Sequence, residues 1–346
     1  MSDLGFTVSK DAEHPLFAGV DVGGTNIKLG IVDNQGRTLL QHKVPTEQER
    51  GPTDAMQRTA DQLESMAAQL EISREDIAAV GLATPGTMDL KTGMLLHPHN
   101  LPAWWEFPIR DCLQNACGYP VWFGNDASVA AYGEFWVGRG IDHHSIVFFT
   151  LGTGVGGGII IGTLSIDGEH SSGSELGHTI IDFTESGRLC GCGKRGCLEA
   201  YASGKAVVQR TMEELEGGVH SRLRERLEQA GELTPLMVAE EADRGDELAR
   251  KIVFDTARYL GIGAVNVMHT IDPGAVIFGG AMDFGGVNSQ LGMEFLNRIR
   301  EEIRQRAFPV LTERTHVDFA SLGGDAGYIG AAGMARIGLQ QANGSP

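Results

Sequence analysis

Apolar runs alternate with glycine-rich and polar turns along the first part of the chain. The pattern predicts a helix over about 53–70, which begins at Pro52, and four strands at residues 16–22, 27–32, 38–44 and 77–83. Turn signals such as Gly23-Gly24 separate the first three strands. Three strands, a helix and a further strand make up one half of a known α/β architecture.

The second half of the chain repeats this pattern of apolar runs and glycine-rich turns. A short strand and a helix are predicted at 121–124 and 127–136, and hairpin strands at 145–151, 157–162 and through Ser165. Helices dominate 203–269, and the remaining elements are a strand at 275–278, a helix at 286–306, a strand at 315–319 and a helix from about Asp325. Duplicated α/β halves favour a ligand cleft between them.

Composition narrows the class of protein. The 346 residues are enough for two domains, and the 48 glycines are about twice the usual share of roughly 7%. The net charge of −17 argues against nucleic acid as a partner. No signal peptide is visible, and the most apolar stretch, 145–162, is interrupted by threonines and glycines. We therefore expect a cytoplasmic protein without a membrane partner.

Two glycine-rich turns have the chemistry of phosphate-binding loops. After Asp21, the residues Val22-Gly23-Gly24-Thr25-Asn26-Ile27-Lys28 offer converging backbone amides and a hydroxyl, and the Asp21 carboxylate is suited to hold magnesium through water. Taken alone, this turn is explained equally well as a plain hairpin. Gly152-Thr153-Gly154 repeats the construction about 130 residues later. Two such hairpins in similar halves are more specific than either one.

Other nucleotide-binding motifs fit less well. The second turn contains a G-x-G-x-x-G match, but strands are predicted on both sides and no helix begins at it. The dinucleotide fingerprint requires that helix, so a Rossmann site is disfavoured. Neither turn ends in the Lys-Ser/Thr pair of a Walker loop.

Three of the five cysteines lie within eight residues, at Cys190, Cys192 and Cys197. Without an export signal, a metal site is a better interpretation than a disulfide framework. Cys112 and Cys117 lack such neighbours and are predicted to be plain thiols.

These residues resemble the ROK sugar kinases (repressors, open reading frames, kinases) of the hexokinase–actin superfamily, and most closely their glucokinases, from Phe17 to about Ile337. The most specific signature is Cys190-Gly191-Cys192-Gly193-Lys194-Arg195-Gly196-Cys197-Leu198-Glu199, preceded by Glu175-Leu176-Gly177-His178. The resemblance implies a duplicated, ribonuclease H-like α/β fold with two domains and a central cleft. We expect a small N-terminal domain at 1–122, joined by the last helix at about 326–346, and a larger domain at 123–325.

The resemblance also implies a structural zinc ion bound by His178, Cys190, Cys192 and Cys197. One imidazole and three thiolates form a closed tetrahedral site, which is typical of structural zinc rather than of a catalytic metal. Free buried thiols are the alternative, and the C-x-C-x4-C spacing disfavours them.

The family's general base corresponds to Asp126, which follows Asn125 at the end of a predicted strand. A helix N-cap is the simpler explanation of this aspartate, and both roles can hold. The resemblance implies that the sugar contacts Gly86, Thr87, Asn100, Asn125, Asp126, Glu175, His178 and Glu199. It implies that ATP and Mg²⁺ contact Asp21, Gly23, Gly24, Thr25, Asn26, Lys28, Gly152, Thr153, Gly154, Gly279, Gly280 and Gly324.

The expected reaction is ATP-dependent phosphorylation of a hexose, glucose to glucose 6-phosphate, by a homodimer. Kinases of N-acetylmannosamine, N-acetylglucosamine or fructose are the alternatives. Asn100-Leu101-Pro102 favours glucose, whereas His99 departs from the small residue expected beside it. A ROK-type sugar-sensing repressor is disfavoured, because only about 15 residues precede the first strand and a DNA-binding module cannot fit there.

Overall fold

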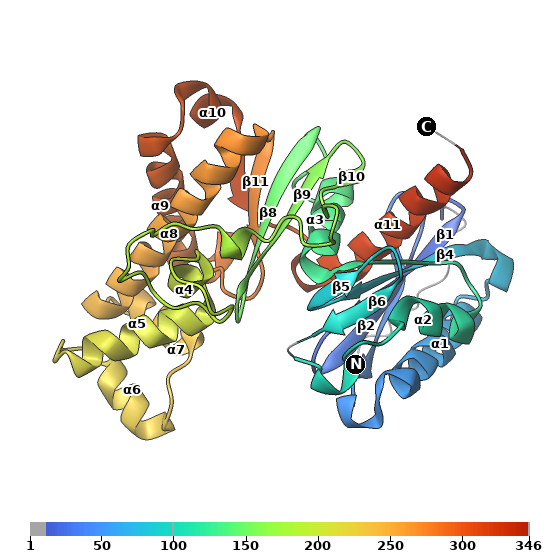
Figure 1. Ribbon diagram of the computed structural model, residues 1–346, viewed down its shortest axis with the longest axis horizontal. Helices are drawn as coiled ribbons and strands as arrows, with labels where there is room; N and C mark the ends of the chain where they lie inside the picture. Colours follow the sequence, from blue (N-terminus) through green and yellow to red (C-terminus); the bar gives the residue numbers. More distant parts are fainter. Residues whose placement is uncertain (1–11, 99, 345–346) are drawn as a thin grey trace. The chain divides into compact units, whose positions relative to one another are not determined.

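The computed structural model describes residues 12–98 and 100–344, and the chain forms two compact units (Figure 1). The first unit contains the residues up to Asp142, residues 158–174, and the chain from Leu322 onward. The second unit contains residues 143–157 and 175–321.

The first unit is built on a five-stranded sheet in the order β3-β2-β1-β4-β7. Its strands are β1 (Leu16–Val22), β2 (Asn26–Val32), β3 (Thr38–Pro45), β4 (Ile77–Thr84) and β7 (Val121–Asn125). Strand β2 is antiparallel to both β1 and β3, and β4 and β7 run parallel to β1. The helices are α1 (Pro52–Gln69), α2 (Ile109–Cys117), α3 (Asp126–Val137) and α11 (Ala326–Ala342), and β5 (Thr87–Asp89) and β6 (Met94–His97) form a small hairpin.

Both faces of this sheet are buried. Successive side chains of β1 point to opposite faces, and each set lies in a different core cluster. Leu16, Ala18 and Val20 lie in the core cluster that contains residues of α1 and α2. Phe17 lies in the other cluster, with Tyr328 and further residues of α11. The last helix of the chain therefore covers the opposite face of the N-terminal sheet from α1 and α2 (Figure 1).

The strand order of the first sheet recurs in a second five-stranded sheet, β10-β9-β8-β11-β12. Its strands are β8 (Ser145–Leu151), β9 (Val155–Ile161), β10 (Leu164–Ser165), β11 (Ala275–Gly279) and β12 (His316–Phe319). As in the first sheet, the three strands that come first in the chain, here β8, β9 and β10, lie in reverse order toward one edge. Two later strands, β11 and β12, run parallel to β8 and extend the sheet on its other side. The fold is therefore a duplicated α/β fold, as the sequence predicts.

The helices of the second unit are α4 (Glu199–Ala202), α5 (Gly204–Glu216), α6 (Leu223–Ala230), α7 (Pro235–Asp243), α8 (Glu247–Ile271), α9 (Gln290–Arg306) and α10 (Pro309–Arg314). The start of α9 differs from the predicted one at residue 286. Gly286–Asn288 forms a separate 3-10 turn, and the Ser289 side chain caps α9 by accepting from Gly292 N. A cap of this kind fixes where a helix begins.

The first unit also contains residues 123–142, 158–174 and 322–325, which the sequence analysis grouped with the larger domain. Strand β7 pairs with β4, and α3 packs on α11 so closely that a Cβ at Gly330 would lie 1.8 Å from Val129 O. The hairpin β5–β6 and the helix α2 were not predicted from the sequence.

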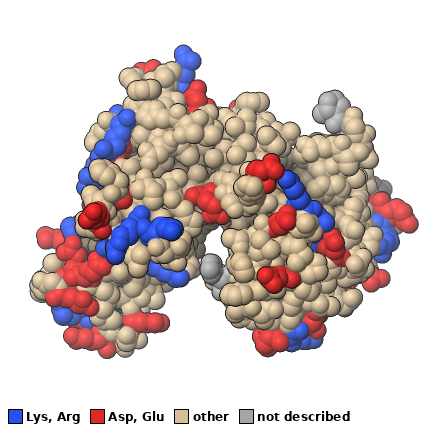
Figure 2. Space-filling model, viewed as in Figure 1, with Lys and Arg blue, Asp and Glu red and all other residues tan. Residues whose placement is uncertain are grey.

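Among the described residues, no helix has the length and apolar character needed to cross a membrane. On the face shown in Figure 2, Lys and Arg side chains lie among Asp and Glu side chains.

The contact between α11 and the sheet yields a stability prediction. A Cβ at Gly81 would lie 1.8 Å from Ala331 O, and backbone cannot yield as a side chain can. We predict that Gly81→Ala lowers the free energy of unfolding by about 1–3 kcal/mol, the range for overpacked cores. Gly217→Ala is the control, since Gly217 has φ −66° and a Cβ there would meet nothing closer than 3.3 Å. Urea unfolding measures both, and equal stability of Gly81→Ala and wild type would contradict the prediction.

Candidate active site

The first glycine-rich turn joins β1 to β2 and presents Gly24, Thr25 and Asn26 to solvent. Gly23 N donates to Asn26 O at 2.9 Å, which closes a tight hairpin. Thr46 holds this turn from the end of β3, because its Oγ1 donates to Gly23 O at 2.7 Å and its N to Thr25 O at 2.9 Å. The turn is thus a braced loop with an exposed hydroxyl at its tip.

Asp21 lies beside this turn, opposite Lys28 in the β1–β2 ladder. Burial raises the pKa of the Asp21 carboxyl, and the positive charge of Lys28 opposes that shift. Lys28 Nζ donates to Gly324 O at 2.5 Å, and a Cβ at Gly327 would lie 2.3 Å from Asp21 Oδ2. The start of α11 therefore brings Gly324 to Lys28 and leaves room for the Asp21 carboxylate.

Asn125, and not Asp126, is the N-cap of α3. Asn125 Oδ1 accepts from Ala127 N at 3.0 Å, while Asp126 is the first residue of the helix and its Oδ1 accepts from Ala127 N at 2.8 Å. The N-cap role that was the simpler explanation of Asp126 therefore belongs to Asn125. The N-terminus of a helix also favours the ionised form of a carboxyl group.

Further predicted sugar contacts gather near these residues. Asn125 Nδ2 donates to Gly86 O at 3.5 Å, and Gly86 has φ +95°. Thr87 follows it as the exposed first residue of β5. A Cβ at Gly24 would lie 3.6 Å from Asn100 Cβ, so Asn100 lies beside the first glycine turn. His99 is outside the described residues.

The second glycine-rich turn, Gly152-Thr153-Gly154, joins β8 to β9, and no helix follows it, as the sequence predicts. Gly152 N donates to Gly154 O at 3.0 Å. A Cβ at Gly280 would lie 2.3 Å from Leu151 O, so the turn that follows β11 lies directly against the end of β8. The structure thus brings Gly279 and Gly280 to this turn, while Gly324 lies with Lys28 in the first unit.

A cavity of about 500 Å³ adjoins the second turn. Its lining residues are Gly152, Thr153, Gly204, Lys205, Val208, Gln209, Pro235, Ala281 and Met282. The side chains of Val208, Pro235 and Met282 make an apolar wall, with Lys205 and Gln209 as polar groups. Such a cavity suits a flat, largely apolar ligand that is joined to an anion. These α5 and α7 residues were not predicted from the sequence, because their helical spacing is that of any amphipathic helix.

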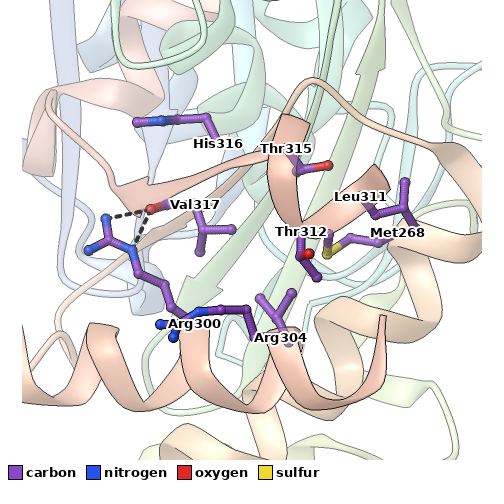
Figure 3. A pocket seen from close by; sticks show the side chains of 9 residues that line it. Met268, Arg300, Arg304, Leu311, Thr312, Thr315, His316 and Val317 are labelled. Carbon is purple, nitrogen blue, oxygen red and sulfur yellow. Dashed lines mark hydrogen bonds between the residues drawn. The ribbon is translucent and has the colours of Figure 1, made fainter. Parts of the chain in front are cut away.

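A smaller cavity of about 200 Å³ in the second unit contains none of the predicted site residues. Figure 3 shows Arg300 reaching from α9 to Val317 of β12, where Nε and Nη2 donate to Val317 O at 3.0 and 2.7 Å. Its guanidinium therefore serves to fasten α9 to the edge of the sheet.

The four predicted metal ligands form one cluster in the second unit. The ligand atoms of His178, Cys190, Cys192 and Cys197 all lie within 4.8 Å of one another. The distance from His178 Nδ1 to Cys190 Sγ is 3.7 Å, and from Cys192 Sγ to Cys197 Sγ also 3.7 Å. A tetrahedron with Zn–S bonds of about 2.3 Å has sulfur atoms about 3.8 Å apart. The donor set and its spacing therefore fit zinc.

The surroundings of these thiols shift their pKa values in different directions. Burial raises the pKa of Cys190 to about 12, whereas a hydrogen bond from the Lys194 backbone lowers the pKa of Cys192. Thiolates are the metal-binding form, so a buried thiol such as Cys190 ionises when a cation compensates the charge.

Glu175 and Glu199 flank this cluster in the sequence. Glu175 is exposed, and its carbonyl accepts from His178 N at 3.0 Å. Glu199 Oε1 lies 3.7 Å from Cys190 Sγ. The Glu199 carboxylate therefore lies next to one metal ligand, and Glu175 contacts another through its backbone.

The chain matches the ROK family over residues 17–337. It belongs to the ROK family. The glucokinase of Halalkalibacterium halodurans is 32% identical over 320 residues, which are 92% of this chain and 94% of that one. The crystal structure of a ROK hexokinase from Thermus thermophilus matches with a TM-score of 0.79 and 31% identity, over 94% of this chain and 99% of that one.

Other relatives are a further glucokinase, a kinase of a different sugar and a repressor. A ROK glucokinase from Streptomyces griseus, solved with glucose and AMPPNP, matches with a TM-score of 0.70 and 33% identity, over 93% of this chain and 99% of that one. An N-acetylmannosamine kinase of Salmonella paratyphi B is 30% identical, over 92% of this chain and 97% of that one. A xylose repressor of Caldicellulosiruptor bescii is 27% identical, over 91% of this chain and 77% of that one. Sugar kinases predominate among these relatives.

The Asp21–Lys28 pair yields a prediction on pH. Lys28 lowers a carboxyl pKa that burial raises, so Lys28→Met should move the pKa of Asp21 upward and protonate Asp21 at a higher pH than in wild type. Carboxyl ¹³C titration of labelled aspartate, assigned with Asp21→Asn, measures the midpoint. Lys43→Met is the control. Lys43 lies opposite Lys28 on the neighbouring strand β3, one strand farther from Asp21. A midpoint that stays or falls in Lys28→Met would contradict the prediction.

Proposed function

We propose that the protein transfers the γ-phosphoryl group of Mg-ATP to a hexose, with glucose as the preferred acceptor. The observation that carries the proposal is the repeated hairpin. The β1–β2 and β8–β9 turns occupy corresponding positions in two sheets of the same strand order, and each presents an exposed threonine, Thr25 or Thr153. A pair of matched glycine–threonine turns suits the two ends of a phosphate chain.

In this proposal the amides and hydroxyls of both turns bind the phosphates, and the Asp21 carboxylate would hold magnesium. The magnesium ion would neutralise charge on the transferred group. Asp126 accepts the proton of the attacking sugar hydroxyl, and Asn125, Asn100 and Glu175 orient the sugar.

The cavity beside the second turn supports a nucleotide as the phosphoryl donor. Its apolar wall of Val208, Pro235 and Met282 is contiguous with Gly152 and Thr153. Polyphosphate has no apolar part to bury there, whereas a purine base does. ATP is therefore the proposed donor.

Glucose is the proposed acceptor because the relatives at 32–34% identity include several glucokinases, and Asn100-Leu101-Pro102 has the form expected of them. The N-acetylmannosamine kinase relative makes that sugar the main alternative. Measuring kcat/KM on glucose, N-acetylmannosamine, N-acetylglucosamine and fructose decides between them. A higher kcat/KM on another sugar would replace glucose, and sugar binding without turnover would point to a sensor instead.

We also propose that the Cys–His cluster holds one structural zinc ion. Four protein ligands leave no open position, so the ion would fix the segment from Glu175 to Glu199 without joining in phosphoryl transfer.

The role of Asp126 can be tested by removing its basicity. Asp126→Asn keeps an oxygen that accepts from Ala127 N, so we predict a folded protein with kcat lowered at least about 10²-fold, as for loss of a general base. Steady-state kinetics with circular dichroism measures both properties. Asp61→Asn, on the exposed face of α1, is the control with unchanged kcat. Turnover of Asp126→Asn near the wild-type rate would remove Asp126 from the mechanism.

Elemental analysis tests the metal. We predict about one zinc per chain, because one closed set of four ligands binds a single ion. Cys192→Ser should lose that zinc, while Cys112→Ser, outside the cluster, should keep it. An active preparation without zinc would contradict the zinc proposal.

A further inference from the structure

One carboxylate touches both the second glycine turn and the metal-ligand cluster. Glu199 is the first residue of α4 and follows Cys197 by two positions. Its Oε2 accepts from Val155 N at 3.0 Å, and its Oε1 lies 3.7 Å from Cys190 Sγ. Val155 is the first residue of β9, immediately after Gly154. The side chain therefore spans from the cluster to the end of the turn.

The chain on either side of the cluster makes two more contacts with this turn. Gly177 precedes the ligand His178, and a Cβ there would lie 2.0 Å from Val155 O. Gly204, which begins α5, donates from its N to Gly152 O at 2.8 Å. Residues 152–155 are thus contacted at both ends by the segment that carries all four predicted metal ligands.

A turn of this composition needs such contacts. Gly152 and Gly154 place few limits on their own backbone angles, so the amides around Thr153 point in a fixed direction only if neighbours hold them. Binding of an anion by backbone amides depends on that direction being set in advance. A Cβ at Gly154 would lie 2.4 Å from Glu199 Oε2, so the carboxylate lies directly against the turn.

We propose that Glu199 is a positioning residue for the phosphate-binding turn, and that the Cys–His cluster thereby contributes to nucleotide affinity as well as to sugar binding. The proposal rests on the proposed function, since it takes Gly152-Thr153-Gly154 as a phosphate site. The hydrogen bond from Val155 N to Glu199, on which the proposal depends, needs no sugar in order to form. The hydrogen bond needs an oxygen acceptor and not a negative charge.

Calorimetric titration of the zinc-loaded protein with AMPPNP and Mg²⁺, without sugar, tests the proposal. Glu199→Ala removes the acceptor, and we expect the Kd for AMPPNP to rise about tenfold, the size expected for loss of one hydrogen bond at a binding loop. Glu199→Gln keeps an amide oxygen for Val155 N and should stay within about threefold of wild type. Hydrogen exchange at the Val155 amide should be faster in Glu199→Ala than in Glu199→Gln.

The matched control is Ser289→Ala, which removes a side-chain acceptor from Gly292 N at the start of α9 and should leave the AMPPNP Kd unchanged. If Glu199→Ala does not fold or loses zinc, Glu199→Asp takes its place, because its shorter carboxylate withdraws from Val155 N and should weaken AMPPNP binding more than Glu199→Gln does.

If Glu199→Ala binds AMPPNP as tightly as wild type, the inference is overturned and the kinase proposal stays intact. The same holds if Glu199→Gln loses as much affinity as Glu199→Ala, because the negative charge and not the oxygen acceptor would then matter. Failure of the wild-type protein to bind AMPPNP and to phosphorylate any hexose would instead overturn the proposed function.

Discussion

The backbone of α11 lies directly against β1 and β4, and the first unit depends on this contact. Cβ atoms at Gly19 and Gly81 would each lie 1.8 Å from a carbonyl oxygen of the helix, Tyr328 O and Ala331 O respectively. Only glycine permits strands and helix to approach so closely. The contact places the first turn of α11 beside Asp21 and Lys28, so the candidate metal-binding carboxylate and the loop before the helix meet at one place.

The two glycine–threonine turns have equivalent positions in the repeated sheets but different supports. In the first unit, Thr46 at the end of β3 donates to Gly23 and Thr25. In the second unit, the support comes from Glu199 and Gly204, which follow the Cys–His cluster in the chain. The duplication therefore conserves the hairpin, while the second half uses a metal-binding segment where the first uses a strand end. In the proposed function, this difference places the structural metal site directly beside the phosphate-binding turn, where the metal takes no part in the reaction.

The sequence predicted what depends on local pattern. The strands of the two five-stranded sheets and the clustering of Cys190, Cys192 and Cys197 with His178 were predicted, because period-two burial and ligand spacing involve neighbours in the chain. The sequence offered Asp126 as a cap of α3, whereas Asn125 is the cap, since both residue types cap helices equally well. The cavity residues Lys205 and Val208 were missed, because helical spacing does not reveal which neighbour a face meets. The role of Glu199 at Val155 N depends on a contact across 44 residues, which no local pattern contains.

Every role proposed for the turns, Asp21 and Asp126 depends on phosphoryl transfer from ATP to a sugar. Incubation of the protein with Mg²⁺, glucose and ATP labelled with ³²P in the γ position tests this directly, with the sugar product separated from inorganic phosphate. The account predicts that the label appears in glucose 6-phosphate in a one-to-one ratio with the ADP formed. Label found only in inorganic phosphate, or retained in ATP with every hexose supplied, would contradict it.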